Sequence, residues 1–130
     1  AQETSFDAEE LTVVWQAVNV EHGCHYCVPA HTGIAKSMKV RDDLIEELRN
    51  DDTLSDAKLN TLKESVLAVT RNRGNIDSAQ LDAFYSAGYK HQQLLEIILI
   101  LAQKVMSNYT NHIAETPVDE PFKKFEWSPK

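Results

Sequence analysis

The stretch Glu21-His22-Gly23-Cys24-His25-Tyr26-Cys27-Val28-Pro29-Ala30-His31 holds both cysteines of the chain, spaced CxxC, and a histidine four residues beyond the second. Apolar residues recur at helical spacing before it, over residues 9–20, and after it, to about Met38. Gly23 separates the two patterns. Proline is tolerated only in the first turn of a helix, so the second helix begins near residue 25 or 26 or is kinked at Pro29. Both arrangements place the cysteines at the beginning of a helix.

The rest of the sequence also shows helical periodicity, interrupted by turn residues. Asp7 is expected to cap the first helix, with Glu10 three residues later completing a capping box. Glycine, asparagine and aspartate mark where the later helices begin and end. The later helices are expected from Asp42, from Leu54 to the stop at Asn72-Arg73-Gly74, from Asp77 or Ser78 to Gly88, and from His91 to about His112.

The longest of these helices, from His91 to about His112, has apolar residues all round its surface. This pattern is typical of a helix at the centre of a bundle or in a subunit contact. The tail from Thr116 contains three prolines and three aromatic residues, and we expect it to pack against the body of the protein. No segment shows the alternation of a strand. The sequence therefore predicts an all-α fold, a bundle of about six helices in a single domain over residues 1–130.

Composition excludes several classes of partner. The 130 residues are 42% hydrophobic and carry a formal net charge of −7, which argues against binding to nucleic acid or an anionic membrane surface. The longest apolar run, Leu94 to Leu101, contains Glu96 and is too short to span a bilayer. We see no signal peptide and expect a cytoplasmic protein. Because the chain starts at Ala1 and not at methionine, we expect either processing or a segment upstream of it.

The CxxC segment is best interpreted as a reversible dithiol, since the chain has no other cysteines. On a helix, His31 is four residues from Cys27 but seven residues, about 10 Å along the axis, from Cys24. His31 should therefore accept the proton of Cys27, and its imidazolium should stabilise the thiolate. This predicts Cys27 as the nucleophile and Cys24 as the resolving cysteine. Either Glu21 or Glu10 is expected to orient the imidazole through a hydrogen bond.

Other interpretations of the same residues are possible. The cysteines could be inert core thiols or a structural staple, although a loop of about four residues gains little from closure. Zinc is the stronger competitor, with Cys24, Cys27 and His31 as ligands and His22, Glu21 or a residue from elsewhere in the chain as the fourth. Tyr26 is expected to pack, with donation of its hydroxyl to a bound peroxide as the alternative. His91 and His112 are expected to be helix-surface or capping residues rather than catalytic ones.

The segment from Gly23 to His31 resembles the GCxYCxxxH signature of the AhpD-like superfamily, also called the carboxymuconolactone decarboxylase family. The resemblance continues through the Gly74 region, the Ala87-Gly88-Tyr89 turn and the segment Ser107-Asn108-Tyr109-Thr110-Asn111-His112. It implies an all-helical cytosolic protein that assembles as a homo-trimer or homo-hexamer. In the AhpD branch, such proteins reduce peroxides or serve a peroxiredoxin through the CxxC. By this resemblance, Cys24, Cys27 and His31 are the redox pair and the proton acceptor.

Two departures from the family pattern concern the proton relay. Tyr26 stands where the AhpD branch has a histidine, and Thr12 stands at the position of the upstream glutamate. Glu10 and Glu21 remain as candidates for that carboxylate. The expected function is a thiol-dependent peroxidase in antioxidant defence, with a hydroperoxide substrate, a thiol or dithiol reductant or a peroxiredoxin as partner, and no cofactor. The alternatives are a non-enzymatic zinc-binding or assembly module and a lactone decarboxylase, whose chemistry needs no CxxC.

Overall fold

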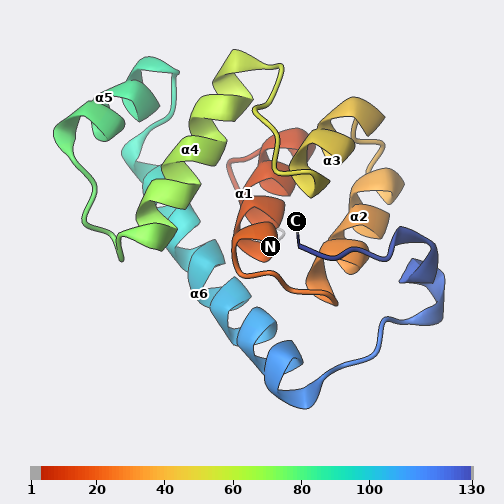
Figure 1. Ribbon diagram of the computed structural model, residues 1–130. Helices are drawn as coiled ribbons and strands as arrows, with labels where there is room; N and C mark the ends of the chain where they lie inside the picture. Colours follow the sequence, from red (N-terminus) through yellow and green to blue (C-terminus); the bar gives the residue numbers. More distant parts are fainter. Residues whose placement is uncertain (1–3, 130) are drawn as a thin grey trace.

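The computed structural model describes residues 4–129, and these contain α-helices and one 3-10 helix but no strand (Figure 1). The prediction of an all-α fold with about six helices is confirmed. None of the described helices is both long and apolar enough to cross a membrane. The helices are α1 (Ala8–Glu21), α2 (Cys27–Ser37), α3 (Asp42–Arg49), α4 (Ala57–Arg71), α5 (Ser78–Ser86), α6 (His91–Ala114) and the 3-10 helix η1 (Glu120–Phe125).

Most helix boundaries follow from capping residues. The backbone N–H of Glu10 donates to Asp7 Oδ1 at 2.8 Å, and the N–H of Asp7 donates back to Glu10 Oε1 at 3.1 Å, which confirms the capping box. Asp77, rather than Ser78, caps α5: its side chain accepts from the backbone N–H of Gln80, the third residue of the helix, at 2.8 Å. Gly88 follows α5 with a φ of +106°, a conformation that glycine adopts without strain.

The beginning of α4 differs from the prediction. Leu54 is buried in the preceding loop and does not start the helix. The side chain of Asp56 accepts from the N–H of Leu59 at 3.0 Å and therefore caps the helix at Ala57.

Helix α2 begins at Cys27, so Pro29 is its third residue and lies within the first turn. The turn that precedes it is already close to helical, because the N–H of Val28 donates to the carbonyl of Cys24 at 3.1 Å. Cys24 thus lies in the entering turn and Cys27 at the helix N-terminus. The predicted placement of the CxxC at the beginning of a helix is confirmed.

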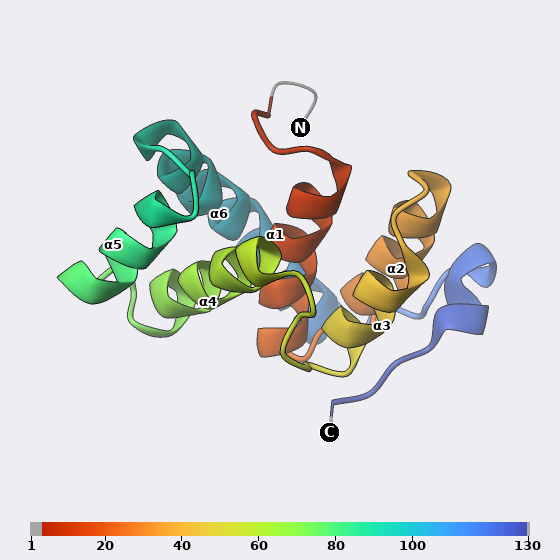
Figure 2. The same cartoon turned by 90° about the horizontal axis from the view of Figure 1, so that it is seen from above.

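Helix α1 occupies the centre of the molecule. It contacts α2, α3, α4 and α6, and most of its middle residues are buried. Figure 2 shows α2 and α3 on one side of α1 and α5 and α6 on the other. The longest helix, α6, is peripheral, with only Ile97, Ile100, Lys104 and Asn108 buried. The expectation that it could be the central helix is wrong, because a second apolar face of α6 points outward.

The C-terminal tail packs on α2 and α3, as predicted from its aromatic residues. The indole N–H of Trp127 donates to the carbonyl of Arg49 at 2.7 Å, and the Arg49 guanidinium donates to the carbonyls of Phe125 and Glu126. A Cβ atom on Gly33 would lie 2.6 Å from the ring of Phe122, so close contact between α2 and η1 requires glycine there.

Candidate active site

Cys24 and Cys27 are adjacent free thiols that are only 0% and 2% exposed. The backbone N–H of Cys27 donates to Cys24 Sγ at 3.2 Å, and the two thiol groups share a hydrogen bond. Because Cys27 is the first residue of α2, its sulfur lies at the N-terminus of that helix, where the helix dipole favours negative charge. The local fold therefore places the two sulfurs side by side but in different environments.

Helix α6 supplies the polar groups that surround Cys27. Asn111 Nδ2 donates to Cys27 Sγ at 3.4 Å, and Asn108 adds a second amide donor. The hydrogen bond from Cys24, the charge of Lys104 and these two amides lower the pKa of Cys27, although burial opposes them. The pKa of Cys24 is raised, because its thiol is held in the hydrogen bond to Cys27 and is buried. Cys27 is therefore the thiolate of the pair.

Lys104 is a buried cation at this site, only 7% exposed, and its Nζ lies 2.9 Å from Nε2 of His31. Burial lowers the pKa of Lys104, while the negative charge of the cysteine pair, carried by Cys27, opposes that change. Among the interactions described for Lys104, the Cys27 thiolate is the one anionic partner. The thiolate and the ammonium consequently stabilise each other.

His31 is a neutral imidazole. Burial and the neighbouring charge of Lys104 lower its pKa to about 3, so Nε2 accepts from Lys104 and Nδ1 carries the hydrogen. That buried Nδ1 has no hydrogen-bond partner, and the ring lies against Trp15 with centroids 4.8 Å apart. The expectation that a His31 imidazolium stabilises the thiolate is wrong, because Lys104 supplies that positive charge.

Neither predicted glutamate reaches His31. Glu21 pairs with Arg71 through two contacts at 2.9 and 3.1 Å, and this pair lies on the surface. Glu10 serves the capping box of α1 and lies 4.0 Å from Lys58. The predicted hydrogen bond between a carboxylate and the His31 imidazole is therefore wrong, because both carboxylates are engaged elsewhere and face cations of α4.

Tyr26 faces the C-terminal tail. Its hydroxyl donates to Asp119 Oδ2 at 2.7 Å, and this bond raises the pKa of Tyr26. Since the hydroxyl is engaged away from the sulfurs, the structure favours the packing interpretation of this residue over peroxide binding.

A chain of buried amides holds the α6 residues in place. Asn108 Nδ2 donates to Asn19 Oδ1 at 2.9 Å, and Asn19 Nδ2 donates to Gln16 Oε1 at 2.9 Å. Gln16 Nε2 donates in turn to the carbonyl of Val28 in the first turn of α2 at 3.1 Å. Each amide is thus oriented by the next, and the network links α1, α2 and α6 beneath Cys27.

The histidines near the CxxC do not form a metal site. His22 Nδ1 is bonded to Asn108 Oδ1 at 3.1 Å, and His31 faces a lysine ammonium. In residues 4–129, no three His, Cys, Asp or Glu side chains are placed to hold a metal ion. A cation also occupies the position next to His31. The geometry therefore does not support the predicted zinc ligand set.

The other histidines lie at the edges of the structure. His112 Nε2 is 3.3 Å from the carbonyl of Gly23, and its ring stacks on His25 with centroids 6.5 Å apart. His112 thus lies beside the CxxC segment, unlike a surface histidine that is remote from the cysteines. His91 pairs with Tyr85 at the opposite end of α6.

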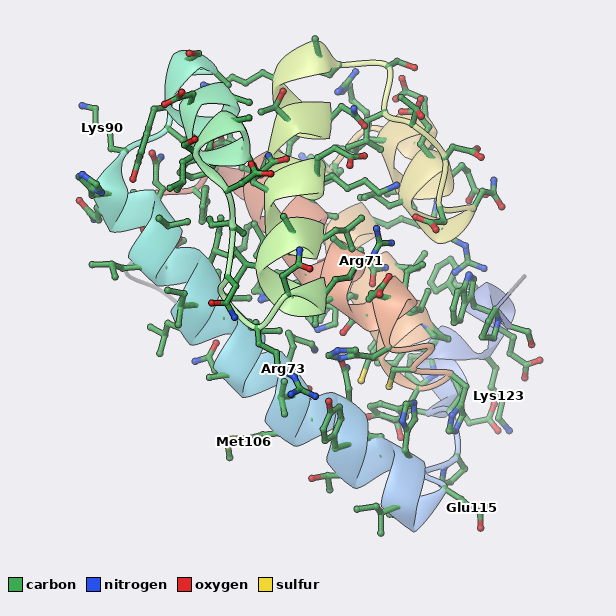
Figure 3. The ribbon with its side chains drawn as sticks, turned by 60° about the vertical axis from the view of Figure 1, so that its left-hand side comes forward. Arg71, Arg73, Lys90, Met106, Glu115 and Lys123 are labelled. Atoms are coloured by element: carbon green, nitrogen blue, oxygen red, sulfur yellow. The ribbon has the colours of Figure 1, made fainter. Side chains whose placement is uncertain are left out.

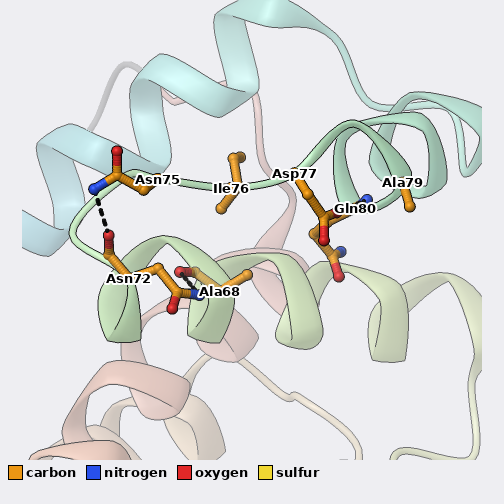
Figure 4. A pocket seen from close by; sticks show the side chains of 7 residues that line it. All are labelled: Ala68, Asn72, Asn75, Ile76, Asp77, Ala79 and Gln80. Atoms are coloured by element: carbon orange, nitrogen blue, oxygen red, sulfur yellow. Dashed lines mark hydrogen bonds between the residues drawn. The ribbon is translucent and has the colours of Figure 1, made fainter.

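A surface pocket of about 510 Å³ lies on α6. Asn111 lines it and also donates to Cys27 Sγ, so this side chain connects the pocket to the cysteine site. A pocket of similar size, about 520 Å³, lies between the end of α4 and the start of α5 (Figure 4). That second pocket shares no residue with the cysteine site. The pocket on α6 is lined by Gln103, Met106, Ser107, Thr110 and Asn111.

Lys104, Asn108 and Asn111 are the site residues that the sequence analysis missed. Lys104 is the one lysine, arginine, aspartate or glutamate between residues 97 and 114, inside an otherwise uncharged run. Asn108 and Asn111 belong to the segment that resembles the family. Their spacing with Ile97 and Ile100 places all of them on one helix face, and this is the signal that could have identified them.

Acid should destabilise the fold through His31. Its pKa is about 3 in the folded protein against about 6.5 when unfolded, so the unfolded state binds the proton first. Stability should therefore fall as pH decreases from about 6.5 towards 3, by on the order of 1 kcal/mol per pH unit. Urea unfolding at pH 4 and pH 7 measures this loss, and the loss should be smaller in His31→Gln. Equal acid sensitivity in the two proteins would contradict a buried neutral His31.

No protein-family model matches the chain, and no curated protein matches it. Two solved structures share its fold, each with a TM-score of 0.79 and 19% sequence identity. One is an uncharacterised peroxidase-related protein from Silicibacter sp. TM1040, and the other is a peroxidase-related protein from Ralstonia eutropha JMP134 described as an alkylhydroperoxidase AhpD core. The alignments cover 92% of this chain but 64% and 65% of those chains, so it spans less than two thirds of their length. The chain therefore has the AhpD-like helical fold that these peroxidase-related proteins share.

Proposed function

We propose that this protein is a thiol-dependent hydroperoxide reductase that cycles Cys24 and Cys27 between dithiol and disulfide. The observation that carries the proposal is the environment of Cys27. Its sulfur lies at a helix N-terminus, near a buried ammonium and two amide donors, and is hydrogen-bonded to a second thiol of raised pKa. Such an environment favours a thiolate nucleophile with a resolving partner beside it. The fold shared with peroxidase-related proteins supports the same assignment.

In the first step, the Cys27 thiolate attacks the terminal oxygen of the hydroperoxide. The O–O bond breaks, Cys27 becomes a sulfenic acid, and the alkoxide leaves as an alcohol after taking a proton. We assign this proton to Cys24, because its thiol is already hydrogen-bonded to Cys27. Lys104 keeps the site positively charged while negative charge moves from sulfur to the departing oxygen.

In the second step, the Cys24 thiolate attacks the sulfenic sulfur of Cys27. The S–S bond forms, the S–O bond breaks, and the departing hydroxide becomes water with a proton from solvent. The two cysteines have then lost two electrons, and the peroxide has become an alcohol and water. An external dithiol, or a protein that carries one, must reduce the disulfide to complete the cycle. We propose the pocket beside Asn111 as the route by which the peroxide approaches Cys27.

A stoichiometric pulse of cumene hydroperoxide tests this function. We expect the loss of two free thiols per protein for each peroxide consumed, and full recovery after treatment with dithiothreitol. Metal analysis of the same sample distinguishes the zinc alternative. Unchanged thiols after the pulse, with or without bound zinc, would overturn the proposal.

A further inference from the structure

Lys104 lies on the inner side of α6. It comes two residues before Met106, whose side chain projects away from the other helices in Figure 3. Two residues turn an α-helix by about 200°, so Lys104 points towards the bundle, where it is buried. Between residues 97 and 114 it is the only Lys, Arg, Asp or Glu. The charge of Lys104 therefore depends on the buried groups around it.

The titratable groups that face Lys104 come from α2 and from the turn before it. Nε2 of His31 lies 2.9 Å from its Nζ, and the cysteine pair, Cys24 and Cys27, acts on it through charge. Burial and the charge of Lys104 keep His31 neutral, with a pKa of about 3. Of these groups, only the Cys27 thiolate brings Lys104 a negative charge.

Helices α1 and α4 also contact α6, and neither adds an anion to the interactions described for Lys104. The buried side chains of α1 are uncharged, and His22, which follows α1, is bonded to an amide of α6. The buried lysine of α4, Lys63, is paired with Asp51 at 3.0 Å. In residues 4–129, the Cys27 thiolate is thus the one anion described for this ammonium.

Formation of the disulfide removes that anion. In the dithiol protein, the negative charge of Cys27 and the positive charge of Lys104 cancel, so the buried site carries no net charge. A disulfide is uncharged, and an ammonium that stayed beside it would be an unpaired buried charge, which is strongly unfavourable. Loss of one proton from Lys104 restores an uncharged site.

The hydrogen bond to His31 holds the nitrogen of Lys104 in place in both charge states. An ammonium has three N–H donors and a neutral amine keeps two, so Nζ can donate to Nε2 of His31 in either state. His31 does not take up the proton itself, because it stays neutral well below physiological pH. It is therefore a positioning residue for Lys104.

We propose that Lys104 is the proton store of the redox cycle: it gives up one proton when the disulfide forms and takes one back from the reductant when the disulfide opens. Lys104 has this role only within the proposed dithiol–disulfide cycle. During oxidation, the departing hydroxide takes a proton from solvent and Lys104 returns one to solvent. Each peroxide thus becomes an alcohol and water without net uptake of protons, and the buried site stays uncharged.

The reductant supplies both protons that the reduced site needs. One thiol of an external dithiol loses its proton to Lys104 and attacks the sulfur of Cys24. Cys27 leaves as the thiolate, because a thiol of lower pKa leaves faster. The second thiol then attacks the mixed disulfide, and Cys24 leaves and takes the proton of that thiol. Two electrons have broken the S–S bond, the reductant has become a disulfide, and its protons are on Lys104 and Cys24.

Redox equilibrium with dithiothreitol between pH 6.5 and 8 tests the proton count. The thiols of dithiothreitol stay protonated in this range, so oxidised dithiothreitol takes up two protons when it oxidises the protein. We expect the wild-type protein to release two, one from Cys24 and one from Lys104, which makes the exchange equilibrium constant independent of pH. If Lys104 kept its proton, the constant for oxidation of the protein would fall about tenfold per pH unit.

Lys104→Arg separates the charge of Lys104 from its proton, because a guanidinium stays positive and does not release a proton in proteins. In this variant the constant should fall about tenfold per pH unit. Lys63→Arg makes the same change at the paired buried lysine of α4 and should keep the wild-type behaviour. Circular dichroism checks that both variants are folded. Should Lys104→Arg fail to fold, Lys104→Met should show the same fall at pH values above its own Cys27 alkylation midpoint.

Alkylation of wild-type Cys27 should have its midpoint below pH 6.5, so that Cys27 is not the source of the second proton. A midpoint above pH 6.5, a tenfold fall per pH unit in the wild-type protein, or a constant independent of pH in Lys104→Arg would overturn the role of Lys104. The titration uses no peroxide, so these results leave peroxide reduction untouched. Conversely, unchanged thiols after the peroxide pulse, together with the expected titration, would overturn peroxide reduction and leave the role of Lys104 in place.

Discussion

Replacing Cys27 by serine is expected to abolish peroxide reduction, with a loss of at least about 1,000-fold in turnover. The hydroxyl of serine stays protonated at neutral pH, and Cys24 cannot substitute for Cys27 because its pKa is raised and it receives neither the Asn111 donor nor the helix N-terminal position. Turnover with cumene hydroperoxide and dithiothreitol measures the effect. The substitution also removes the anion that stabilises the buried Lys104 ammonium, so the melting temperature should fall, and circular dichroism should show that the variant is still helical.

Replacing Cys24 by serine is the matched control for the order of the two cysteines. This variant should still react once with peroxide, and a sulfenic acid should accumulate on Cys27, where dimedone labels it. The Cys27→Ser protein should not be labelled. If dimedone instead labels Cys24 in the Cys27→Ser protein, or if both serine variants turn over, the assignment of nucleophile and resolving cysteine is wrong.

Replacing Lys104 by methionine is expected to raise the pKa of Cys27, because the charge of the buried ammonium lowers that pKa in the wild-type protein. The midpoint of the iodoacetamide alkylation profile should move up by about 1–2 pH units. At pH values below the midpoint, reaction with peroxide should slow by about 3- to 10-fold. The loss of thiolate exceeds the gain in nucleophilicity that accompanies a higher pKa.

Lys63 provides the control for Lys104→Met. It is also a buried lysine, 4% exposed, but it lies on α4 and is paired with Asp51 at 3.0 Å. Lys63→Met should lower the free energy of unfolding, because it leaves Asp51 and a backbone carbonyl without their donor, and it should leave the Cys27 midpoint unchanged. Lys104→Met should change stability by less than about 2 kcal/mol, because removal of a buried charge offsets the hydrogen bond lost by His31. An unchanged midpoint in Lys104→Met would show that the amides and the helix N-terminus activate Cys27 without the lysine.

Local signals in the sequence were sufficient for the helices and the position of the cysteines. The helix caps bond to the backbone of residues only a few positions away, so the helix ends that they mark could be predicted without tertiary information. These caps are the Asp7–Glu10 capping box, Asp77 and Gly88. Pro29 restricted the start of α2 in the same way. The start of α4 was the exception, because both Leu54 and the cap at Asp56 are compatible with the apolar pattern and only one of them makes the capping bond.

The charged partner of the site could not be predicted in this way. Glu10 and Glu21 were candidates because they are near the cysteines in sequence, but Lys58 and Arg71, from a different helix, hold them elsewhere. Lys104 is 77 residues beyond Cys27, and nothing local directs it there. Its position depends on which face of α6 turns inward, and a helix with apolar residues all round leaves that choice to the packing of α1 and α2.

By itself, the sequence determined that this protein is all-helical and that its two thiols lie at a helix beginning. These properties arise from turn residues, caps and i to i+4 spacing, which act within a few residues. Only the tertiary structure decided which groups stabilise the Cys27 thiolate, that the nearby charge is the Lys104 ammonium and not a His31 imidazolium or a carboxylate, and that α6 keeps an apolar face outside. Those outcomes depend on burial and on side chains that converge from α1, α2 and α6, because electrostatic effects on a pKa act through space and not along the chain.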